Sequence, residues 1–76
     1  MMKYYIAVEE VRSTVVEVDA ESESEAMLKI EKAYSEDEIC LDKPQYINDS
    51  TQFYDETELW MEVIKNGFKK EFQKIK

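Results

Sequence analysis

Hydrophobic and polar residues alternate in two stretches near the N terminus, at residues 3–9 and 13–19. This alternation is typical of a β-strand that buries one face and turns the other to water. Only a few polar residues, around 10–12, separate the stretches, so a tight antiparallel hairpin is the economical interpretation. The face expected to be buried carries Tyr4, Ile6, Val8, Val16 and Val18. The opposite face, which we expect to meet water, carries Glu9, Glu17 and Asp19.

The sequence after the hairpin carries a helix start signal and then a helical apolar stripe. Ser22 and Glu25 have the spacing of a capping box, in which each side chain satisfies the other residue's backbone N–H. Acidic side chains in this region also suit the positive end of a helix dipole. The apolar residues at helical spacing are Ala26, Met27, Ile30, Ala33 and Tyr34. We therefore predict a helix from about Glu23 to Tyr34 that packs this stripe on the sheet.

The chain after this helix is predicted to form a loop followed by a third strand. Polar residues at 35–38 end the helical period, and Pro44 argues against both a continued helix and a central strand. Ile39 and Leu41 are expected to anchor the loop on the core. β-favouring residues then predict a strand near Thr51 to Asp55.

After Thr57, apolar residues lie three or four positions apart and predict an amphipathic helix. They are Trp60, Ile64, Phe68, Phe72 and Ile75, with Leu59 and Val63 beside them. Asn66-Gly67 interrupts this pattern. It could end the helix with a left-handed cap, leaving a second short helix. It could also form a tight turn that pairs residues 59–64 with 68–74 as a second hairpin. The many Glu, Leu, Met, Lys and Gln residues favour the helix.

These patterns together predict an α+β fold. Residues 1–56 are expected to form a small β-β-α-β domain with an antiparallel sheet and one helix packed on it. Residues 57–76 are expected to form a C-terminal amphipathic helical extension that packs on this domain or on a second copy. A chain of 76 residues buries only about 60–65% of the surface of its unfolded form, so its core is marginal and invites association.

The charge is unevenly distributed along the chain. Asp and Glu number 18 against 10 Lys and Arg, a net charge of −8. Residues 1–63 carry a net −12, and residues 64–76 carry a net +4. An acidic body repels the phosphates of nucleic acids, which argues against direct binding of DNA or RNA. The partner that this charge favours is a basic protein surface, with association fastest at low salt.

The composition also excludes most catalytic chemistry. The sequence contains no histidine, the commonest general base and metal ligand. Cys40 is the only cysteine and is interpreted as a small buried hydrophobe rather than a nucleophile. Gly67 is the only glycine, so there is no Gly-rich phosphate loop. We therefore expect no enzyme activity, no cofactor and no metal.

The same composition points to the cytoplasm. A single unpaired thiol suits a reducing compartment. The N terminus lacks the apolar region and cleavage site of a signal peptide. No apolar run approaches the about 18 residues of a membrane span.

Several short sequence elements occur in a particular order. They are Lys3-Tyr4-Tyr5-Ile6, Thr14 to Ala20, Ser22-x-Ser24-Glu25-Ala26, Tyr34, Glu38-Ile39-x-Leu41-Asp42 and Tyr46…Gln52-Phe53. In this order, over about residues 3–56, the chain resembles the DpnD/PcfM-like family of small acidic proteins. The resemblance implies a compact β-β-α-β domain and a setting on phages, plasmids and restriction cassettes of Gram-positive bacteria. It implies no activity and no functional residue.

The acidic residues define one candidate binding face, which consists of Glu21, Glu23, Glu25, Glu36, Asp37 and Glu38. One interpretation is a solvated surface that also stabilises the start of the helix. Another is a nucleic-acid mimic, in which spaced carboxylates imitate a phosphate backbone and occupy a basic groove. A Ca²⁺ site is a third interpretation, but the chain lacks the Asp-x-Asp-x-Asp-Gly loop that would support it.

The aromatic residues Trp60, Phe68 and Phe72 define a second candidate surface. They could pack on the sheet, or mediate self-association as a homodimer, since aromatic residues are favoured at interface centres. With the lysines between them, they could instead stack on single-stranded nucleic acid. A basic amphipathic helix for a membrane surface or a partner groove is a further interpretation.

Size, charge and the implied setting lead to one functional hypothesis. The chain is expected to be a non-enzymatic inhibitor of a host defence nuclease, of the anti-CRISPR or anti-restriction type. Its acidic face would act as a DNA mimic in the basic channel of the nuclease. The alternative is a small dimerising structural or regulatory module of a plasmid or restriction cassette.

Overall fold

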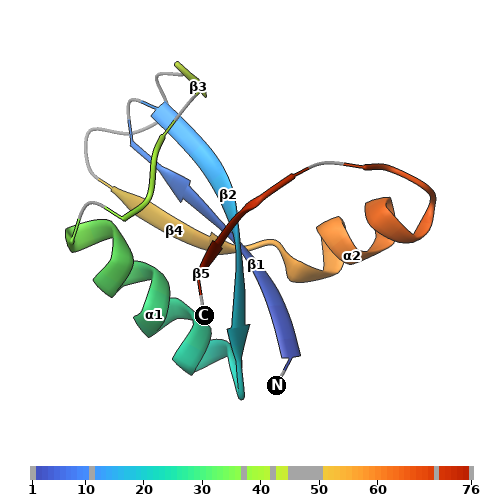
Figure 1. Cartoon of the computed structure of the whole chain (residues 1–76), viewed down its shortest axis with the longest axis horizontal. Helices are drawn as coiled ribbons and strands as arrows, with labels where there is room; N and C mark the ends of the chain where they lie inside the picture. Colours follow the sequence, from blue (N-terminus) through green and yellow to red (C-terminus); the bar gives the residue numbers. More distant parts are fainter. Residues whose placement is uncertain are drawn as a thin grey trace.

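The computed structural model describes residues 2–10, 12–36, 38–41, 43–44, 51–69 and 71–75. These residues form a small α+β fold, in which a mixed sheet is accompanied by two helices (Figure 1). Along the chain the elements are β1 (Met2–Glu9), β2 (Arg12–Ala20), α1 (Glu23–Ser35), β3 (Lys43–Pro44), β4 (Gln52–Asp55), α2 (Thr57–Lys65) and β5 (Gln73–Ile75).

The strands form one five-stranded sheet with the order β3-β2-β1-β4, and β5 also pairs with β2. β1 and β2 form the predicted antiparallel hairpin, from Met2 opposite Ala20 to Glu9 opposite Ser13. β4 pairs antiparallel with β1, and β3 pairs antiparallel with the start of β2. The prediction of a wholly antiparallel sheet was wrong, because β5 runs parallel to β2 at residues 16–18.

The parallel pairing has a topological cause. β4 is antiparallel to β1, and β1 is antiparallel to β2, so β4 and β5 run in the same direction on opposite sides of the hairpin. Parallel strands cannot be joined by a tight turn and need a crossover, which is usually a helix. α2 and the residues after it make this crossover, and Phe72 contacts Tyr5 on the sheet face opposite α1.

α1 covers one face of the sheet and builds the main core. The buried side chains of this core are Ile6, Val8, Val16, Val18, Ala20, Ala26, Ile30, Ala33 and Ile39. Tyr4 is partly buried and packs against them. The buried face predicted from the alternating pattern is therefore confirmed.

The opposite face of the sheet is not the water-exposed face that the pattern predicted. Tyr5 and Ala7 on β1 are buried, and so is Glu17 on β2, with 9% of its surface exposed. Glu9 and Asp19 are half-buried. The physical reason is the crossover, which brings α2 and Phe72 over this face.

α1 begins as predicted. Ser22 is its N-cap, and its Oγ accepts a hydrogen bond from the backbone N–H of Glu25 at 3.2 Å. This bond satisfies one of the N–H groups that have no partner inside the helix. The helix extends one residue beyond the predicted end, to Ser35. Ala26, Ile30 and Ala33 form its buried stripe.

The segment between α1 and α2 follows the prediction where it is described. Ile39 is buried and Leu41 packs partly buried against the core. β4 confirms the predicted third strand. Pro44 lies in β3, a two-residue strand on the outer side of β2, which is compatible with the confinement of proline to sheet edges. Residues 45–50 lie outside the described residues.

The C-terminal residues do not form a single amphipathic helix over 57–76. α2 ends at Lys65, and the chain then returns to the sheet as β5. The second hairpin considered for this region is also wrong, because β5 pairs with β2 and not with residues 59–64.

The end of α2 is a left-handed cap, as one of the sequence interpretations held, but the second short helix expected after it is wrong, because the chain continues to strand β5. Gly67 has a φ of 96°, a conformation that glycine adopts without steric cost. Its backbone N–H donates to the carbonyl of Ile64 at 3.0 Å, and that of Phe68 donates to the carbonyl of Val63 at 3.2 Å. This pair is the Schellman arrangement, which satisfies carbonyls at a helix C terminus and turns the chain away from the helix axis.

Candidate binding surfaces

The predicted acidic residues lie around α1 and fall into two groups. Glu21 and Glu23 are exposed where the helix begins, and Glu36 and Glu38 are exposed where it ends. A helix of 13 residues is about 20 Å long, so the two groups are well separated. Asp37 lies outside the described residues.

Two glutamates within α1, Glu25 and Glu31, differ from the sequence prediction of the acidic residues available for binding. Glu25 is half-buried, and its carboxylate lies 3.2 Å from Lys29 Nζ, which also donates to the backbone carbonyl of Asp19 at 2.8 Å. Glu25 is therefore held within the chain by an i, i+4 pair. Glu31, between the two groups, is exposed and was not predicted as a site residue. Helical periodicity alone could have placed it on the outer side.

We call the exposed carboxylates on this helix and just beyond its two ends the acidic α1 face: Glu21, Glu23, Glu31, Glu36 and Glu38. Within the described parts of the chain, none of these carboxylates forms an ion pair. Lys32 lies with Glu36 and Glu38 around a shallow hollow of ≈310 Å³, so positive charge is close to the end of the helix. The negative charge of the face is therefore least compensated toward its start.

The three aromatic residues predicted for self-association contact one another inside a single chain. The ring centroids of Trp60 and Phe72 are 5.3 Å apart, and those of Trp60 and Phe68 are 5.9 Å apart. Phe72 also meets Tyr5 of β1 edge-on at 5.0 Å. Phe68 is the most exposed of the three predicted residues. Self-association through these residues stays a prediction.

Hydrogen bonds fasten the start of α2 to β1. The backbone N–H of Tyr5 donates to Thr57 Oγ1 at 3.0 Å, and its carbonyl accepts from the N–H of Glu56 at 2.8 Å. Asp55 Oδ1 accepts from the backbone N–H of Thr57 at 2.9 Å and also from its hydroxyl. These contacts set the direction in which α2 leaves the sheet.

Glu17 lies at the centre of the second sheet face, opposite Tyr5 on β1 and beside Lys74 on β5. Tyr5 OH donates to Glu17 Oε1 at 3.3 Å, and Lys3 Nζ lies 3.7 Å from Oε2. A buried carboxylate needs such partners, because leaving it unpaired away from water is costly. Burial, and next the charge of Glu17, raise the pKa of Tyr5 above its usual value.

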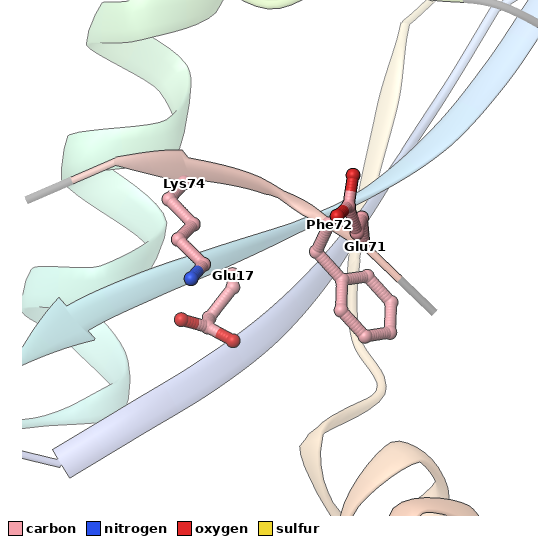
Figure 2. Close-up of a pocket in the computed structure, with 4 residues that line it drawn as sticks. All are labelled: Glu17, Glu71, Phe72 and Lys74. Carbon is pink, nitrogen blue, oxygen red and sulfur yellow. The ribbon is translucent and has the colours of Figure 1, made fainter. Parts of the chain in front are cut away.

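A hollow of ≈360 Å³ lies beside this carboxylate, lined by Glu17, Glu71, Phe72 and Lys74. Figure 2 shows that Lys74 extends from the last segment of the chain toward Glu17, whereas the ring of Phe72 lies to one side and points away from this carboxylate. Lys74 thus brings positive charge to the hollow beside the buried carboxylate, and Phe72 forms another part of the wall of this hollow. This arrangement explains how a charged residue is accommodated in the covered face.

The sequence contained a signal for this second covered face. Tyr4 to Val8 is a continuous apolar run, which is typical of a strand buried on both sides. Glu17 could then have been assigned to the covered face by its register with β1.

Gln73 is a structural residue that sequence reasoning missed. Its Oε1 accepts from the backbone N–H of Cys40 at 2.7 Å, and its Nε2 donates to the carbonyl of Cys40 and to Thr14 Oγ1. Gln73 therefore ties β5 to β2 and to the loop after α1. The prediction that Cys40 is buried was wrong: the loop turns Ile39 into the core and leaves Cys40 exposed.

The described residues contain neither a metal-binding cluster nor a membrane-spanning helix. No group of three acidic or cysteine side chains among them is arranged to hold a metal ion. No helix in the same part of the chain is long and apolar enough to cross a membrane.

The fold and its charged surface define a small acidic α+β protein. The family described as DpnD/PcfM-like protein matches residues 4–49, which is more than half of the chain and includes most of β1 and all of β2, α1 and β3. The chain therefore belongs to the DpnD/PcfM-like family, as the sequence resemblance indicated. No curated protein and no solved structure matches the chain.

Proposed function

We propose that this protein is a non-enzymatic binding protein of the bacterial cytoplasm that inhibits a host defence nuclease of the CRISPR or restriction type. The observation that carries the proposal is the acidic α1 face, whose carboxylates are exposed and have no ion-pair partner within the described chain. Family membership supports the setting, since the resemblance implies phages, plasmids and restriction cassettes.

The mechanism is competition with nucleic acid for a basic channel. Each strand of a DNA duplex carries one negative charge per about 3.4 Å, so the about 20 Å of α1 corresponds to roughly six phosphates. The acidic α1 face spreads five carboxylates over a similar length. Lysine and arginine side chains that normally neutralise phosphates can therefore engage these carboxylates instead.

The test is capture of partners from a Gram-positive host lysate at low salt, with proteins identified by mass spectrometry. The tagged wild type should recover a nuclease or its guide complex. High salt or added DNA should release it, because the contact is electrostatic and competes with nucleic acid. A bait in which the five residues of the acidic α1 face are changed to Gln should not recover it.

A matched pair of single reversals locates the surface. Glu31 and Glu71 are both exposed, but only Glu31 belongs to the acidic α1 face. Glu31→Lys should weaken binding of the recovered nuclease about tenfold at low salt, whereas Glu71→Lys should change it little. Equal recovery by the wild type and the Gln variant, or equal effects of the two reversals, would contradict the proposal.

A further inference from the structure

β5 is held on the sheet more weakly than the hairpin against which it packs. It has three residues, none of them buried, whereas β1 and β2 each contain several buried residues. A hollow borders β5 on each face of the sheet, one of ≈360 Å³ beside Lys74 (Figure 2) and one of ≈310 Å³ beside Ile75. Side chains that border a hollow lack packing partners on that side, so β5 gains less from dispersion contacts than a central strand does.

We call residues 71–75 the C-terminal strap, because a small set of side-chain contacts fastens them to the rest of the fold. Phe72 packs on aromatic rings of β1 and α2, Gln73 bonds to the loop after α1, and Ile75 packs partly buried against the core. The chain reaches the strap through Gly67, which has a φ of 96° and no atom within 4 Å of its Cβ position. A glycine in open space can absorb a large backbone rotation, so Gly67 is placed to act as a hinge.

Release of the strap would uncover one edge of β2. β5 pairs with residues 16–18 on this edge, and β3 pairs with residues 12–13 alone. The backbone N–H and C=O groups of residues 16–18 that face β5 would then have no strand partner, and such an edge is a template for another extended segment. Glu17 lies at the middle of this edge, and its carboxylate would lose the positive charge of Lys74.

We propose that the C-terminal strap is a detachable strand, which swings out about Gly67 and leaves the edge of β2 to an extended segment of a partner protein. The register of β5 shows what this segment carries: Lys74 lies opposite Glu17, and Ile75, the next residue, lies opposite Val18. A basic residue is required opposite Glu17, because a largely buried carboxylate needs a partner. Main-chain hydrogen bonds then supply affinity, and this basic-apolar order supplies specificity. This docking edge goes beyond the proposed inhibition and does not depend on the acidic α1 face.

Competition with the strap sets the affinity of this edge for a separate segment. The strap is tethered to the edge, so it acts at an effective concentration in the millimolar range, and a separate segment has to displace it. Phe72→Ala removes the two aromatic contacts of the strap and should raise the population of its open state about 30-fold or more. A separate segment should therefore bind this variant much more tightly than the wild type.

Hydrogen exchange of the full chain, followed by mass spectrometry, tests the opening. Amides of the strap should exchange at least about tenfold faster than those of the β1–β2 hairpin, because the strap opens without global unfolding. Phe72→Ala should accelerate exchange in the strap about 30-fold and in β1 far less. Phe68→Ala is the matched control and should change the strap little, because Phe68 contacts Trp60 and is 44% exposed. Equal exchange of strap and hairpin in the wild type, or equal acceleration of both by Phe72→Ala, overturns the proposal.

A labelled synthetic peptide with the sequence of residues 68–76 tests the docking edge by fluorescence anisotropy. It should bind the Phe72→Ala protein with a Kd on the order of 100 μM, and the wild type at least about tenfold more weakly. Gln73→Ala, a milder change to the strap, should give an intermediate Kd, and circular dichroism should show that both variants are folded. A peptide with Lys74→Glu should not bind, because it places a carboxylate against Glu17. A peptide with Lys69→Glu should bind like the unchanged peptide, because Lys69 is exposed and lies outside β5. Failure of the peptide to bind the folded Phe72→Ala protein, or equal binding of the two altered peptides, overturns the proposal.

Discussion

Replacing Phe72 with alanine should destabilise the protein strongly, although this residue lies outside every helix and strand. Its ring packs between Tyr5 of β1, at 5.0 Å, and Trp60 of α2, at 5.3 Å. Both contacts have the edge-to-face geometry that aromatic pairs prefer. Phe72 is thus the side chain that joins the crossover to the second face of the sheet.

The magnitude follows from burial and contacts. Phe→Ala substitutions in full cores cost about 3–5 kcal/mol, and Phe72 is half-buried, so about half of that is expected. Each lost aromatic pair adds about 0.5–1.5 kcal/mol, though neighbouring contributions are not additive. We expect a total loss of about 2–3 kcal/mol. A protein of this size has a free energy of unfolding of about 4–11 kcal/mol, so the loss is a large part of it.

Urea unfolding at low protein concentration measures this loss. Trp60 is the only tryptophan and lies in the cluster, so its fluorescence reports on the crossover, and circular dichroism reports on the whole fold. With a slope near 1 kcal/mol/M for a small protein, the midpoint should fall by about 2–3 M. Phe68→Ala is the matched control, because Phe68 is 44% exposed and contacts Trp60 at 5.9 Å. It should cost about 1 kcal/mol or less.

The expected role of Phe72 is refuted if Phe72→Ala and Phe68→Ala lower the free energy of unfolding by the same amount and both by less than about 1 kcal/mol. That result would mean that Phe72 does not hold the crossover on the sheet. The burial of Tyr5 and Glu17 would then need another explanation.

Three further substitutions test other features of the fold. Gly67→Ala should cost about 1–2 kcal/mol in a urea titration, from backbone strain at a φ of 96° rather than from a clash, because the space around it is open. Gln73→Ala should lower the thermal midpoint by several degrees, because it leaves the loop after α1 without its hydrogen bonds to β5. The pKa of Tyr5 is raised in the folded state by burial and by Glu17, so the folded phenol keeps its proton at a pH where the unfolded chain loses it. This contribution to stability is present below about pH 10 and is lost as the pH rises through the folded pKa. Tyr5→Phe should therefore flatten the fall of the thermal midpoint between about pH 9 and 12, and an unchanged fall would contradict this assignment.

The elements predicted well from the sequence are those with local signals. The hairpin has a period of two and a short turn, and α1 has Ser22 as its cap and a continuous apolar stripe. The crossover has no local signal of comparable strength. It depends on three residues of β5 that pair with β2, more than fifty positions earlier in the chain. The same apolar spacing that predicted a long helix is used by a helix, a cap and a strand in succession.

The acidic α1 face was predictable only in part, because charge is visible in the sequence but the pairing and exposure of each side chain depend on the helix. Charge counts located the acidic residues, but only the helix geometry shows that Glu25 pairs with Lys29 and that Glu31 is exposed. Both could be derived from helical spacing once the helix is accepted. The burial of Glu17 could not be derived from β2 alone, because the signal for it is the apolar run of the paired strand β1 and the residues beside it come from the C-terminal segment.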